Sequence, residues 1–143
     1  MKELLERFIQ LERTLAQERG DFGLFALFLR EDAGGGSGTS GYSGYSAKWD
    51  LIVAAPWIER DRKEALSYIT GGVQAAFTPV ELSQLSRIVL IDLANPEVEA
   101  INRAFGVQHG QAEIRESNFF GLQIKHAYMI TSQRTNINEQ IPA

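Results

Sequence analysis

Hydrophobic residues recur near the start of the chain at spacings of three and four positions, which is the period of an amphipathic helix. Gly20 follows this stripe at a point where a glycine commonly ends a helix. The pattern predicts a helix over residues 2–18 that lays one face on a sheet. The apolar positions of the stripe are Leu4, Leu5, Phe8, Ile9, Leu11 and Leu15.

Two strands are predicted next. The segment 22–30 (FGLFALFLR) is apolar on both alternating faces, as is typical of a central strand that is covered on both sides. The segment 48–55 (KWDLIVAA) has the same character, and Pro56 is expected to end it because proline lacks an amide donor. The simplest connection is an antiparallel hairpin whose long tip is the glycine-rich segment 34–46.

Capping signals mark three helix starts further along the chain. Asp61 precedes Glu64 by three residues, which is the spacing of a capping box. The segments 78–81 (TPVE) and 95–97 (NPE) place a capping side chain before a proline and a carboxylate, and 87–93 (RIVLIDL) is predicted as a buried strand between them. The inner faces of the first and third helices are expected to consist of Leu66, Ile69 and Val73, and of Val98, Ile101 and Phe105.

A second hairpin is predicted near the end of the chain, with arms over 112–116 and 122–132 and a turn over 117–121. The tail 133–143 is polar and without period, and we expect it to be frayed or docked on a partner. Strict alternation in the second arm would place on one face Leu122, Ile124, His126, Tyr128 and Ile130.

These elements predict a single globular domain over residues 1–132 in the order α-β-β-α-α-β-α-β-β. Hairpins at both ends require antiparallel pairs, whereas the helical crossovers between them allow parallel ones. The expected fold is therefore α+β, or α/β, with a mixed five-stranded sheet and helices packed on it.

Composition narrows the class of protein. The net charge is −4 with both signs interspersed, which opposes nucleic-acid binding because such proteins usually carry a basic stripe. Cysteine is absent, so disulfides and thiolate metal sites are excluded. No secretory signal and no bilayer-spanning apolar run are visible, and we expect a cytoplasmic, non-membrane protein.

The glycine-rich segment contains GSGTSG at 36–41, which matches the G-x-G-x-x-G pattern of dinucleotide-binding proteins. That pattern requires a helix directly after the last glycine, but a strand is predicted here, so no cofactor is expected. The segment is either a passive hairpin tip or a binding loop. Tyr42 and Tyr45 favour a binding loop, because exposed tyrosines anchor interfaces, although both could fold back onto the sheet.

Two carboxylates stand inside apolar strands, Asp50 and Asp92. Either of them, together with Gln123 and Lys125, resembles the D…(D/E/Q)-x-K constellation of restriction-endonuclease-like folds, which implies a magnesium-dependent nuclease. The alternative is structural: Asp50 faces solvent beside Lys48, and Asp92 is wetted at a strand end.

The two histidines give no metal signal, because His109 and His126 share no ligand-like spacing with a carboxylate. We expect His109 to be a solvated loop residue and His126 to be a hydrogen-bonded core histidine.

The leading hypothesis is a non-enzymatic binding or protein-interaction module that contacts a protein partner or forms a homo-oligomer. Its support is the aromatic content of segments expected to be exposed: Tyr42, Tyr45, Trp57, Phe119 and Phe120. The alternative is a metal-dependent nuclease or other hydrolase, which requires Asp50 or Asp92 to converge with Glu113 and Lys125.

Overall fold

A computed structural model describes residues 2–30 and 48–133; the glycine-rich segment, with both of its tyrosines, and the tail 134–143 lie outside these ranges. The structure confirms an α+β fold with a mixed five-stranded sheet. It adds one short helix, α3, to the expected order. The elements are α1 (Lys2–Arg19), β1 (Leu24–Arg30), β2 (Trp49–Ala54), α3 (Pro56–Arg60), α4 (Arg62–Ala76), α5 (Pro79–Leu82), β3 (Leu85–Leu90), α6 (Pro96–Ala104), β4 (Ala112–Phe119) and β5 (Leu122–Ser132).

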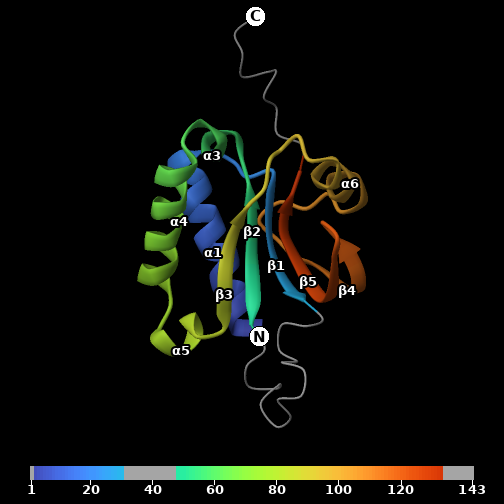
Figure 1. The fold of residues 1–143 in the computed structure, drawn as a ribbon. Helices are drawn as coiled ribbons and strands as arrows, with labels where there is room; N and C mark the ends of the chain where they lie inside the picture. The colour runs from blue at the N-terminus through green and yellow to red at the C-terminus, as the bar shows by residue number, and fades with distance from the viewer. Residues whose placement is uncertain (1, 31–47, 134–143) are drawn as a thin grey trace, which may run out of the picture.

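The strands lie in the order β3-β2-β1-β5-β4, so that β1 is central and β3 and β4 form the two edges (Figure 1). The pair β2–β3 is parallel and the other three pairs are antiparallel. The first two strands therefore form the expected antiparallel pair. None of the helices in the described ranges combines the length and apolar character that crossing a bilayer requires.

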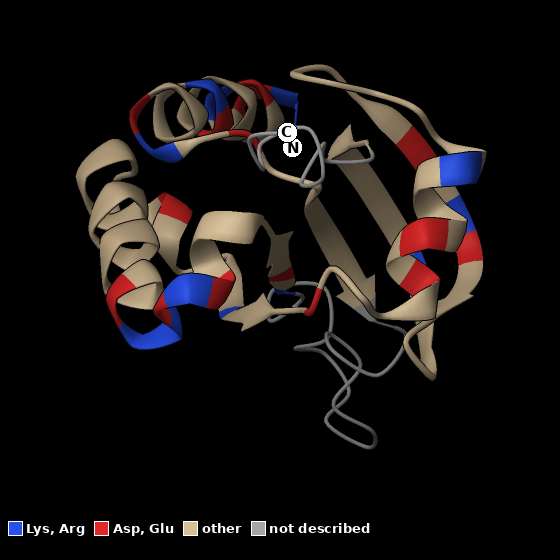
Figure 2. Ribbon diagram, turned by 90° about the horizontal axis from the view of Figure 1, so that it is seen from above, with Lys and Arg blue, Asp and Glu red and all other residues tan. Residues whose placement is uncertain are grey.

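Helices cover both faces of the sheet. The helices α1, α3 and α4 lie on one face and α6 lies on the other, as the view down the sheet makes clear (Figure 2). Along β1, Phe25 and Leu27 enter the core beneath α1 and α4, whereas Ala26 and Phe28 enter the core beneath α6. This central strand is buried on both sides, which explains its continuous apolar sequence.

The predicted helix caps are present. The side chains of Asp61 and Asn95 accept hydrogen bonds from backbone amides of α4 and α6, and Thr78 forms a complete capping box with Glu81. The inner face of α4 differs from the expectation by one position. It consists of Ala65, Ile69 and Val73, whereas Leu66 is 39% exposed.

The prediction of one shared face along β5 is wrong for part of the strand. Ile124 lies in the core beneath α6, with Ala127 and Met129, whereas Tyr128 and Ile130 pack on the α1 side. The pairing of β5 with β1 shifts register at two places. Each shift inserts an unpaired residue, which resets the alternation of side chains between the faces.

The second hairpin is tighter than expected, because β4 continues to Phe119 and the turn contains only Phe120 and Gly121. Both turn residues have positive φ, 55° and 75°. Such a two-residue turn matches the right-handed twist of the flanking strands.

Candidate functional site

The two strand-borne aspartates occupy different environments. Asp50 is only 1% exposed, and its Oδ2 lies 3.3 Å from Nε of Arg87 on the neighbouring strand, so the expectation that it faces solvent is wrong. Asp92 follows the end of β3, and its side chain is 63% exposed and paired with Arg62. Asp92 is therefore a wetted carboxylate at a strand end, as the structural interpretation predicted.

The residues of the nuclease hypothesis are not brought together. Glu113 lies on the edge strand β4, where it contacts His126 and Arg115, and two strands separate it from the strand of Asp50. Gln123 and Lys125 are exposed on β5, which is separated from β2 by β1. Within the described ranges, no three histidine or acidic side chains are arranged to hold a metal ion.

His126 belongs to a small aromatic cluster. Its ring centroid lies 4.7 Å from that of Tyr128 and 5.6 Å from that of Trp49. Its Nε2 lies 2.5 Å from Oε2 of Glu113, and this hydrogen bond lowers the pKa of the Glu113 carboxyl. Burial raises the pKa of Tyr128. The expectation of a hydrogen-bonded histidine is confirmed, with an edge carboxylate as its partner.

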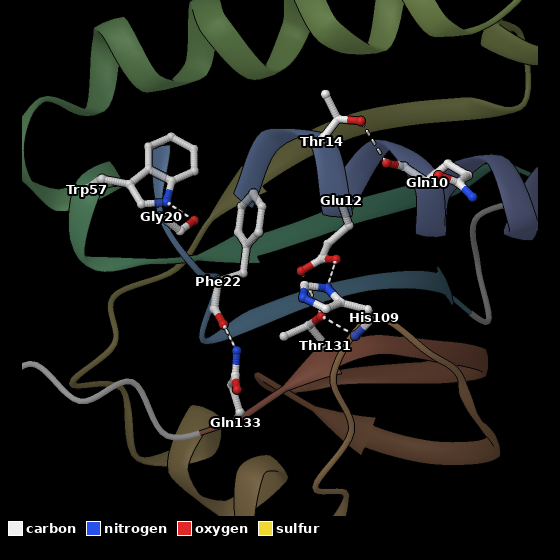
Figure 3. A network of polar contacts seen from close by, with 9 residues as sticks. All are labelled: Gln10, Glu12, Thr14, Gly20, Phe22, Trp57, His109, Thr131 and Gln133. Atoms are coloured by element: carbon white, nitrogen blue, oxygen red, sulfur yellow. Dashed lines mark hydrogen bonds and ion pairs between the residues drawn. The ribbon is translucent and has the colours of Figure 1, made fainter. Parts of the chain in front are cut away.

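A buried polar cluster that the sequence did not suggest joins α1 to the segment 105–111 (Figure 3). Glu12 is fully buried. Its Oε1 lies 2.5 Å from Nδ1 of His109, and its Oε2 accepts a hydrogen bond of 2.8 Å from the Thr131 hydroxyl. The same hydroxyl accepts a bond of 3.1 Å from the His109 amide, so the three residues close a ring. His109 is therefore held at α1 and is not a solvated loop residue.

The chemistry of this cluster is that of an anchor. A carboxylate without partners would be costly to bury, and the imidazole and the hydroxyl satisfy it. The His109 backbone has a φ of 53°, which is unfavourable for a residue with a side chain. The cluster compensates for this conformation by fixing the segment 105–111 against α1. One signal was present in the sequence, since Glu12 stands four residues after Phe8 on the apolar stripe.

The aromatic residues expected to be exposed are packed wherever they are described. Trp57 is 7% exposed, and its Nε1 donates a hydrogen bond of 2.9 Å to the carbonyl of Gly20. Phe119 and Phe120 are half-buried against Phe28. Trp57 is thus a core residue, and the prediction for the two tyrosines of the glycine-rich segment falls outside the described residues.

A groove runs between α1 and α4 on the outside of the molecule, with a volume of about 1210 Å³. Its long walls are the two helices, and its polar rim comes mainly from α1. Beyond Glu64, α4 carries no charged side chain, as the colouring of Figure 2 shows. The small and apolar residues that line the groove include Leu11, Leu15, Gly71, Gly72, Ala75 and Ala76.

Glycine determines how closely the two helices approach. A Cβ atom at Gly72 would lie 3.2 Å from Cδ2 of Leu15 and 3.4 Å from Cδ1 of Leu11, so any larger side chain would press on α1. At Gly71, on the open side of the same turn, a Cβ atom would meet no atom within 4 Å. The groove therefore has a closed floor at Gly72 and free space above Gly71.

Polar contacts hold α1 and α4 together at the end of the groove that is formed by the C-terminus of α1. Arg19 donates two hydrogen bonds of 2.8 Å to the Glu64 carboxylate, which lowers the pKa of that carboxyl. The guanidinium lies 3.9 Å from the centre of the Tyr68 ring. The Tyr68 hydroxyl donates to Glu18, and burial together with this bond raises the pKa of Tyr68 to about 12.

The other end of the groove has an acidic rim. Arg7 is paired with Glu81 on α5 at 2.8 Å, so its charge is compensated. Glu3 and Glu6 line the groove and have no ion-pair partner among the described residues. The exposed rim is therefore negative.

Comparison with known proteins gives no match, either to a protein-family model, to a curated protein or to a solved structure.

Proposed function

We propose that this protein is a protein-interaction module that binds a helical segment of a partner protein in the groove between α1 and α4. The observation that carries the proposal is the groove itself, with a volume of about 1210 Å³, an apolar floor and an acidic rim. Helix-in-groove binding requires such a floor for the apolar face of the incoming helix.

The dimensions and the small residues favour a helix as the occupant. The lining of the groove runs along α1 from Glu3 to Glu18, which corresponds to roughly 22 Å of helix axis. On α4, the positions Ser67, Gly71 and Ala75 recur every four residues and line the groove. Small side chains at this spacing allow two helix backbones to approach closely.

The charge of the rim favours a basic partner. Glu3 and Glu6 are uncompensated, whereas the arginines at both ends of the groove are already paired with carboxylates. An amphipathic helix with lysine or arginine beside its apolar face would place its cations at these carboxylates. Complementary charge of this kind increases the association rate and rejects acidic partners.

The test uses a synthetic amphipathic helix of leucine, alanine and lysine, together with a copy in which glutamate replaces each lysine. Calorimetry should show that the lysine peptide binds and the glutamate peptide does not. Gly71→Leu should fill the groove and weaken binding at least tenfold. The matched control is Gly106→Leu, because Gly106 also has free space around it but does not line the groove. Equal binding by both variants, or no binding of the lysine peptide, would reject the proposal.

A further inference from the structure

The two edges of the sheet differ in how they are protected. The edge strand β4 carries Glu113, Arg115 and Glu116 as exposed side chains, and Glu116 has a φ of 52° that distorts the strand. Charges and local distortion are devices that prevent an edge from pairing with another strand. On β3 the charged residue is Arg87, and its guanidinium is directed to Asp50 of the adjacent strand. The β3 edge therefore lacks the protection that β4 has.

The backbone of β3 offers a definite set of groups on its outer side. The Ile91 amide donates a hydrogen bond of 2.9 Å to the Val53 carbonyl on β2. The backbone amide and carbonyl groups of successive strand residues point to opposite sides. Those of Val89 therefore also point toward β2, whereas those of Ile88 and Leu90 point outward, away from the sheet. No strand of the described sheet lies beyond β3.

Apolar side chains on β3 and on the helices that adjoin it are incompletely covered. Ile88, Val89 and Leu90 are only partly buried, unlike the fully buried residues of β1. Among the described residues, the two large hydrophobic side chains that are exposed are Leu66, at 39%, and Val80, at 73%. The first lies on α4, which packs on β3, and the second lies on α5, which leads into β3.

We propose that the β3 edge is a self-association surface, on which β3 pairs antiparallel with β3 of a second copy of the chain around a two-fold axis at Val89. This register places Ile88 opposite Leu90 of the other copy. The backbone groups of both residues point outward, so each pair exchanges two backbone hydrogen bonds. The side chains of both residues lie on the α1 side of the sheet, so the two side chains of each pair pack together. The two sheets become continuous.

The charges favour a second copy over a foreign partner. A two-fold axis brings the same surface patch of both copies together, so a patch of uniform charge repels itself there. The acidic rim of the groove is unsuitable for such a contact. Around Val89 the strand carries only apolar side chains and Arg87, which Asp50 already compensates. The β3 edge can therefore meet a second copy of itself without repulsion between like charges.

The first experiment measures the oligomeric state of the full chain by sedimentation velocity from low to high micromolar concentration. The proposal expects a monomer–dimer equilibrium. Val89→Glu places two like charges directly opposite each other on the axis and should give a monomer throughout. The matched control is Asn118→Glu, at an exposed position of the opposite edge strand, which should leave the dimer intact. A monomer at all concentrations of the unmodified chain would overturn the proposal.

Amide exchange resolves which edge is used. In the dimer, the amides of Ile88 and Leu90 should become protected as concentration rises, whereas the Val89 amide, already bonded to β2, should not change. Circular dichroism verifies that the glutamate variants are folded. A dimer in which Ile88 and Leu90 exchange freely would show that another surface associates, and the inference would be wrong.

Discussion

The Nδ1 atom of His109 lies 2.5 Å from Oε1 of Glu12, although 97 positions of sequence separate the two residues. The contact joins α1, on one face of the sheet, to the segment that follows α6, which covers the other face. Glu12 is fully buried, so its carboxylate depends on His109 and Thr131 for the interactions that water would otherwise provide.

Removing the imidazole should therefore destabilise the folded protein. His109→Ala is expected to lower the free energy of unfolding by about 2–3 kcal/mol, because it leaves a buried carboxylate with one partner. Urea unfolding measures the change. The control is the same substitution in a Glu12→Leu background, where no buried charge remains and the loss should be much smaller. Equal losses in both backgrounds would show that the pair is not coupled.

The neighbouring glycines of α4 should respond differently to alanine. Gly71→Ala is expected to raise the free energy of unfolding by up to about 1 kcal/mol, because alanine favours the helix and a Cβ there meets no atom within 4 Å. Gly72→Ala gains the same propensity but presses on Leu15 at 3.2 Å, so its net effect should be near zero or destabilising. If both variants gain equally in thermal unfolding, Gly72 does not set the spacing of α1 and α4.

The pair formed by Glu113 and His126 predicts a contribution to stability that acid removes. Hydrogen bonding to His126 lowers the pKa of Glu113 below its unfolded value. The Glu113 carboxyl therefore releases its proton more readily in the folded state than in the unfolded state. Its contribution to stability is fully present at a pH above its unfolded-state pKa and is lost as the pH falls through its folded-state pKa. The urea midpoint of Glu113→Gln should lie below that of the unmodified protein at neutral pH and approach it in acid. Glu116→Gln, which removes the same charge from an exposed position of the same strand, provides a charge control.

Tyr68 predicts a transition at high pH. Its pKa is raised to about 12, chiefly by burial and then by the bond to Glu18. A raised pKa stabilises the folded state at every pH below the pKa that the tyrosine has in the unfolded chain. This contribution to stability is lost as the pH rises toward 12. In an absorbance titration, the ionisation of Tyr68, identified by its loss in a Tyr68→Phe variant, should occur near pH 12. In Glu18→Gln it should move to lower pH; an unchanged curve would contradict the assignment.

The sequence predicted the elements whose signals are local. The buried pattern of 22–30, the capping box at Thr78 and the Asn95–Pro96 helix start each depend on residues a few positions apart, and all three are present. The order of the elements, and hence the mixed sheet, followed from them. The short helix α3 was missed because the chain restarts directly at Pro56, within the segment that was expected only to end the strand.

The features that the sequence did not predict depend on distant contacts. The bulges of β5 reset its alternation through pairing with β1, and no local pattern marks them. Asp50 is buried against Arg87, which lies on a strand reached only after three helices. His109 was interpreted as solvated because its partner, Glu12, belongs to the first helix. Each case required knowledge of which segments become neighbours.

The central position of β1 has a consequence for how the protein is made. Leu24 and Phe25 pair with Ser132 and Thr131, so one side of β1 must wait for the last strand of the sheet. During synthesis, the apolar β1 can pair with β2 early, but its other edge stays open until β5 has left the ribosome. Such long-range pairing slows folding and exposes an aggregation-prone edge. We therefore expect shielding of β1 to improve the folding yield of the nascent chain.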